Sequence, residues 1–136
     1  MLNRFSSILT GIATGIAVLF LTETLSHLLY PLPTGLNPER ADDMRKIMQQ
    51  MPVNALIIVF IGDFLCALSG GIVCTLMSKE NKLRNSLIVG LILTVFGFLN
   101  FMTIPHPMWF MVGSLFIYFA GAFIGYKLIM MIKKDA

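Results

Sequence analysis

The sequence predicts an all-α membrane protein, with four transmembrane helices in an antiparallel bundle and one short amphipathic helix outside the membrane. The 136-residue chain is 57% hydrophobic and 12% charged, about half the charged share of a typical soluble domain. Its charged residues gather at a few positions and leave four long apolar runs between them. Each run can cross a hydrocarbon core of about 30 Å, and the chain length suits a single domain, residues 1–136.

The first apolar run, residues 7–30, begins like a signal peptide. It is longer than a signal sequence needs and ends without an Ala-x-Ala cleavage pattern, so we expect a retained signal anchor. Gly11 and Gly15 form a G-x-x-x-G pair, and Thr22 and Ser26 continue the same helical stripe. Small residues let helices approach closely in lipid, so this stripe predicts a packing face.

The segment after the first run predicts a turn and then a short helix. Its prolines and Gly35 end the first helix. Asn37 followed by Pro38 is typical of a helix start, with Asn as the cap and Pro at the first position, and predicts a helix over residues 38–51. Its apolar residues recur at helical spacing. We therefore expect an amphipathic helix that lies on the membrane surface or caps the bundle.

The other three runs span residues 52–77, 85–103 and 108–132. Small residues recur at helical spacing in each of them, which again predicts packing faces. Asp63 falls within the small-residue arc of the second run, so we expect it to point into the protein. Cys66 lies eight residues before the second cysteine, roughly 12 Å along one helix, which is too far for a disulfide.

Basic residues predict the orientation. The side that holds both termini carries Arg4, Lys79, Lys82, Arg84, Lys127, Lys133 and Lys134, whereas the other side carries Arg40, Arg45 and Lys46. This asymmetry predicts a multi-pass protein of the cell inner (plasma) membrane with both termini in the cytoplasm and the amphipathic helix outside. These residues sit at segment ends rather than in one patch, so they indicate topology and no nucleic-acid partner.

Strongly polar residues within the runs predict a ligand-binding site. The candidates are Glu23, His27, Asp63, Asn100, His106, Ser114 and Tyr118. A rise of about 1.5 Å per residue places all of them between the membrane midplane and the outer surface. A midplane carboxylate costs about 2.5–3.5 kcal/mol on insertion scales, so Asp63 needs a partner or a function. We expect an outward-facing polar pocket floored by Asp63 and Tyr118, with His27 and His106 near its mouth.

Three functions are compatible with such a pocket. The first is binding or transport of a small solute, ion or proton. The second is a non-catalytic structural subunit, in which Glu23 accepts hydrogen bonds from Asn100, Tyr118 or a histidine and fixes the packing. The third is a lipid-modifying enzyme that uses Glu23 and a histidine near headgroup depth.

Catalytic and metal chemistry are less well defined in the sequence. It carries no nucleophile–base pair, phosphate-binding loop or haem motif, so we assign no catalytic residue and favour a protein that is not an enzyme. Glu23, His27, Asp63 and His106 are ligand types found in zinc or manganese sites. Only Glu23 and His27 have a fixed spacing, so the sequence leaves a metal and any cofactor open.

Two short motifs carry a resemblance. Tyr30-Pro-Leu-Pro-Thr-Gly35 follows the first run, and Ile104-Pro-His-Pro-Met-Trp-Phe110 precedes the last. In these motifs the chain resembles a group of small bacterial four-span inner-membrane proteins of unassigned function. The resemblance implies the order of the spans and carries no activity.

Glycine pairs such as Gly121 and Gly125 also lead us to expect that the bundle self-associates in the lipid bilayer.

Overall fold

The computed structural model describes residues 2–135 and is entirely helical over that range. The helices are α1 (Leu2–Leu29), α2 (Ala41–Gln50), α3 (Val53–Met77), α4 (Lys82–Thr103) and α5 (Met108–Asp135). All except α2 are long and apolar enough to cross a membrane. The predicted all-α class and the four candidate spans are therefore confirmed.

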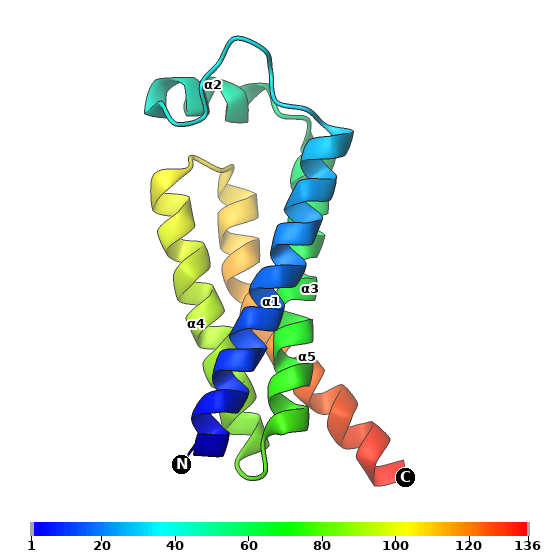
Figure 1. Cartoon of the computed structure of the whole chain (residues 1–136). Helices are drawn as coiled ribbons and strands as arrows, with labels where there is room; N and C mark the ends of the chain where they lie inside the picture. Colours follow the sequence, from blue (N-terminus) through cyan, green and yellow to red (C-terminus); the bar gives the residue numbers. More distant parts are fainter. Residues whose placement is uncertain (1, 136) are drawn as a thin grey trace.

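The long helices alternate in direction, so that both ends of the chain lie at one end of the molecule and α2 lies across the other (Figure 1). Helix α3 is central and packs against α1, α4 and α5. Helix α4 packs against α5 and, less extensively, against α1. Helices α1 and α5 make no contact over the described residues, so they flank the bundle on either side of α3.

The predicted packing face of α1 lies against α3 along most of its length. A Cβ atom placed on Gly11 would lie 2.7 Å from the carbonyl oxygen of Gly70, so only glycine fits there. Near the other end of the seam, the Ser26 hydroxyl donates a hydrogen bond to the carbonyl of Ala55, at 3.3 Å. The two backbones approach closely because side chains at this seam are small.

The glycines of α5 also pack inside the chain. A Cβ atom on Gly121 would meet Ala67 of α3 at 2.9 Å, and one on Gly125 would lie 2.6 Å from the carbonyl oxygen of Leu68. The small-residue stripes thus serve contacts within one chain. They offer no free surface to a second copy, so the expected self-association stays a prediction without support from these stripes.

The predicted start of the amphipathic helix is wrong. Helix α2 begins at Ala41, and Arg40 occupies its cap position without a side-chain capping bond. The Asn37 side chain instead accepts a hydrogen bond from the backbone amide of Glu39, at 2.9 Å, and the Asn37 carbonyl accepts one from Arg40, at 3.1 Å. The Asn-Pro sequence therefore forms a separate turn, because asparagine caps turns as readily as helices.

Three other boundaries extend past the apolar runs. Helix α1 begins at Leu2 rather than residue 7, and α5 continues to Asp135. Helix α4 begins at Lys82, because Asn81 adopts a left-handed conformation with a φ of 50° and makes the turn there. The predicted apolar run begins only at residue 85 and leaves residues 82–84 outside the span. Hydropathy marks the membrane-buried part of a helix, whereas the helix itself can continue into polar surroundings.

Candidate ligand-binding site

A cavity of about 580 Å³ lies below α2, between α1, α3, α4 and α5. Six of the seven predicted site residues line it: Glu23, His27, Asp63, Asn100, His106 and Tyr118. The seventh, Ser114, does not line the cavity but donates a hydrogen bond to Asp63. The structure thus brings the predicted residues together at one cavity at the α2 end, and the remaining wall is mostly apolar.

Asp63 forms the floor of the cavity and is only 3% exposed. The Ser114 hydroxyl donates a hydrogen bond to its Oδ2 at 2.6 Å, and the Tyr118 hydroxyl donates one to its Oδ1 at 2.5 Å. Both donors lie on one face of α5 because they are four residues apart. The Tyr118 ring fills the space beside Gly97 of α4. One carboxylate thus joins α3 to α5, with α4 packed behind the tyrosine.

Glu23 and His27 lie one turn apart on α1 and face the same cavity. Glu23 is half-buried and His27 is exposed. The Glu23 carboxylate interacts electrostatically with the His27 ring and with Asp63. Tyr118, one of the three donors considered for Glu23 in the structural-subunit alternative, donates to Asp63 instead. Within residues 2–135 the Glu23 side chain has no hydrogen-bond partner, so its oxygens are available to a ligand.

His106 lies in the turn between α4 and α5 and is held on three sides. Its ring stacks on Phe110 with centroids 4.9 Å apart and meets the edge of Phe101 at 5.2 Å. Its Nδ1 lies 2.8 Å from the carbonyl oxygen of Ile104, which fits a neutral ring that donates from Nδ1. Burial lowers the pKa of His106 below its usual 6.5, and the bond to Ile104 partly opposes this shift.

Helix α2 forms the roof of the cavity. Met44, Ile47, Met48 and Met51 line the cavity from this side, and Ile47 is only 1% exposed. Of the two expected positions for the amphipathic helix, the structure shows the one that caps the bundle. Methionine side chains adapt to different shapes, so this roof can fit ligands of more than one form.

Charge is distributed unevenly around the cavity. Glu23 and Asp63 contribute two carboxylates, whereas none of the described lysines and arginines lines the wall. The cavity therefore favours a positively charged ligand. Among residues 2–135, no group of three or more His, Cys, Asp or Glu residues is close enough to hold a metal ion. The four candidate metal ligands therefore share a cavity but are not grouped as a metal site. Both cysteines are free, as their spacing along one helix predicts.

A polar network that the sequence reasoning missed closes the opposite end of the bundle. The Asn85 amide donates hydrogen bonds to the Ser78 hydroxyl and the Glu80 carbonyl, both at 3.1 Å, and its oxygen accepts one from Arg4. The Ser78 hydroxyl in turn donates to Ser7 at 3.0 Å. The sequence predicts loop and helix-end positions for these residues, and polar side chains are common at such positions. Only their burial in the structure reveals the network.

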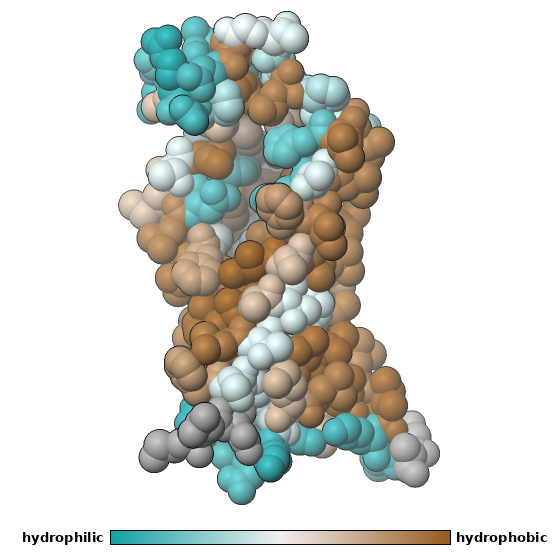
Figure 2. Space-filling view, in the orientation of Figure 1, coloured by the Kyte–Doolittle hydropathy of each residue, from teal (hydrophilic) through white to brown (hydrophobic). Residues whose placement is uncertain are grey.

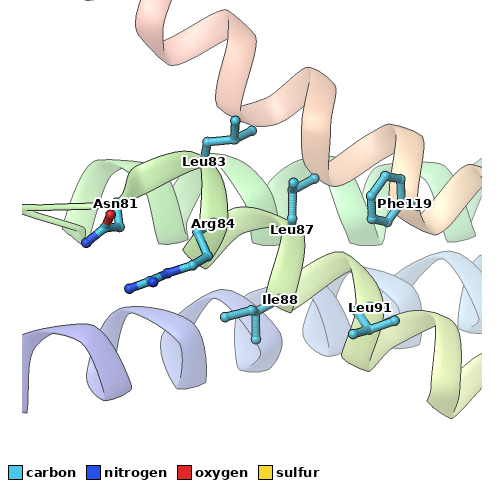
Figure 3. A pocket seen from close by; sticks show the side chains of 7 residues that line it. All are labelled: Asn81, Leu83, Arg84, Leu87, Ile88, Leu91 and Phe119. Carbon is cyan, nitrogen blue, oxygen red and sulfur yellow. The ribbon is translucent and has the colours of Figure 1, made fainter.

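A second depression lies on the outer surface of α4 and has a volume of about 480 Å³. Figure 3 shows its side chains spread along α4, with Phe119 of α5 beside them. Apart from Asn81 and Arg84 at one end, its wall is apolar. It holds no group of carboxylates or imidazoles, so the cavity below α2 is the candidate site.

In comparisons with protein-family models, curated proteins and solved structures, nothing matches the chain.

Proposed function

We propose that this is a multi-pass protein of the cell inner (plasma) membrane that binds a small organic cation in the cavity below α2. One observation carries the proposal: among the described residues, two carboxylates, two histidines and no lysine or arginine line a cavity whose wall is otherwise mostly apolar. Carboxylates at low dielectric attract a positive charge strongly, and apolar walls suit the carbon body of an organic ion better than a hydrated metal ion. A volume of about 580 Å³ falls within the usual range for small-molecule sites.

The two carboxylates have different roles in this proposal. Asp63 is held in place by Ser114 and Tyr118 and supplies a fixed charge at the floor. Glu23 lacks such partners within the described chain and reaches the ligand directly. The opposite half of the bundle is closed by contacts such as Gly11 against Gly70. In this conformation the ligand therefore enters and leaves the cavity at the α2 end. Such an arrangement suits the outward-open state of a carrier.

The proposed orientation places both termini in the cytoplasm and α2 outside, with four antiparallel transmembrane helices between. It is supported by the excess of basic residues at the end that holds the termini. Single cysteines can test it in whole cells, in a chain that carries Cys66→Ala and Cys74→Ala. An impermeant maleimide should label Arg45→Cys and spare Lys79→Cys, both of which are exposed. Labelling of position 79 alone would reverse the orientation.

Ligand binding can be tested with two amphiphiles of equal tail length and opposite charge. The purified protein in lipid nanodiscs should bind octyltrimethylammonium at least tenfold more tightly than octyl sulfate, as measured by calorimetry against empty nanodiscs. Glu23→Gln and Asp63→Asn should each weaken binding of the cation at least tenfold. Glu80→Gln, at the opposite end of the bundle, is the matched control. Equal affinity for both amphiphiles, or unchanged binding in both cavity variants, would refute the proposal.

A structural subunit remains the second candidate, because both oxygens of Asp63 are already paired within the chain. In that case the polar groups serve to fix the packing of α3 and α5. The same variants separate the two functions. A packing role predicts that Asp63→Asn changes the unfolding free energy while Glu23→Gln, which removes no hydrogen bond, changes neither stability nor binding.

A further inference from the structure

The cavity has an open side between α1 and α4. These two helices contact each other less than any other pair of neighbouring helices, and Figure 1 shows them apart in the half nearer α2. Figure 2 shows this face hollowed below α2, with hydrophilic surface at the edges of the hollow and apolar surface around it. The other sides of the cavity are closed by packed helices. The hollow faces sideways, where the bilayer would lie.

The edges of this opening carry polar side chains on both helices. His27 of α1 and Asn100 of α4 line the cavity and are exposed on the outer surface. Each lies within the last turn of its helix, where a helix that spans the bilayer would reach the lipid headgroups. Below them, Ile16 is 45% exposed and Phe96 is 50% exposed, and both also line the cavity. The opening is thus polar at headgroup depth and apolar beneath.

The route through α2 is obstructed by comparison. Ile47 is 1% exposed, and it lines the cavity together with methionines of the same helix. A ligand entering from the aqueous side would have to displace this apolar roof. A ligand entering from the side would pass a polar headgroup-level edge and could leave an alkyl chain between α1 and α4.

We propose that the cavity is loaded from the outer leaflet of the bilayer, through the opening between α1 and α4, and that its ligands are amphiphilic cations. This inference rests on the proposed function and adds the entry route and the ligand class. Glu23 lies one turn deeper than His27, roughly 6 Å along α1. It draws the positive group inward past the edge, while the tail remains against the exposed apolar side chains of the opening.

Entry can be tested by blocking the edge. In a full-length chain with both native cysteines changed to alanine, Asn100→Cys is reacted with N-cyclohexylmaleimide, which places a bulky group in the opening. Leu99→Cys, reacted in the same way, is the matched control, because residue 99 is 53% exposed and does not line the cavity. Binding of octyltrimethylammonium in nanodiscs is followed by stopped-flow fluorescence of Trp109, whose ring contacts Phe110 in the cavity wall.

Modification at position 100 should slow association at least tenfold, and modification at position 99 should change it less than twofold. Equal rates in the two modified proteins would overturn lateral entry. The unmodified chain provides a second measurement that requires no variant. It should bind octyltrimethylammonium at least tenfold more tightly than tetramethylammonium, and equal affinities would overturn the amphiphile class. If neither cation bound the unmodified chain, the proposed function would itself fail, and this inference with it.

Discussion

Removal of the Tyr118 hydroxyl tests whether Asp63 is a paired, buried group. Tyr118→Phe keeps the ring that packs beside Gly97 and removes only the donor to Asp63 Oδ1, now at 2.5 Å. Asp63 would retain its bond from Ser114 and lose one of its two partners. Because the carboxyl is 3% exposed, water replaces the lost donor poorly.

The expected cost follows from the kind of bond. A hydrogen bond to a charged group contributes about 1.5–3 kcal/mol, and one between neutral groups about 0.5–1.5 kcal/mol. Side-chain bonds between membrane helices average about 0.6 kcal/mol and reach about 1.7. The short distance and the burial of Asp63 place this bond near the upper membrane value. We expect Tyr118→Phe to lower the unfolding free energy by about 1.5 kcal/mol, roughly a tenfold change in the unfolding constant.

A double-mutant cycle in mixed micelles measures this energy. Unfolding is followed for the unmodified chain, Tyr118→Phe, Asp63→Ala and the double variant, which isolates the interaction because each single change removes either the donor or the acceptor. Tyr126→Phe, eight residues further along α5, is the control and should change the free energy by less than about 0.5 kcal/mol. A coupling energy below about 0.5 kcal/mol between positions 63 and 118 would refute a strong Asp63–Tyr118 bond.

Three further predictions concern the helix seam, the opposite end and the turn. Gly15→Ala would place a Cβ atom 2.8 Å from the carbonyl oxygen of Cys66 and should destabilise the bundle by about 1–3 kcal/mol in the same unfolding assay. Asn85→Ala removes three hydrogen bonds of a buried amide and should cost about 2–3 kcal/mol, whereas Asn54→Ala, at an exposed position, should cost less than about 0.5 kcal/mol. The pKa of His106 is lowered in the folded state, so the unfolded chain binds the proton first and stability should fall as the pH drops through 6.5 towards the lower folded value. Unfolding measured at pH 7.5 and pH 5.5 should show this loss, and His106→Gln should reduce it; an unchanged pH dependence in that variant would contradict the assignment.

The sequence by itself determined the helical class, the four candidate spans and the end of the molecule at which the polar residues meet. Hydropathy and helical periodicity are local properties, so they reveal which segments are apolar and which face of α1 packs. Depth along an apolar run is also local, because each residue adds a fixed rise. This is why Glu23 and Asp63, far apart in the chain, could be placed near each other before any contact was known.

Only the tertiary structure decided which polar groups pair and where the cavity opens. Tyr118 donates to Asp63 rather than to Glu23 because contacts such as Gly121 against Ala67 set the rotation of α5 against α3. The gap between α1 and α4 likewise results from both helices packing on α3 more closely than on each other. Neighbour order and helix rotation depend on contacts between distant segments, and a local pattern in one helix does not contain them.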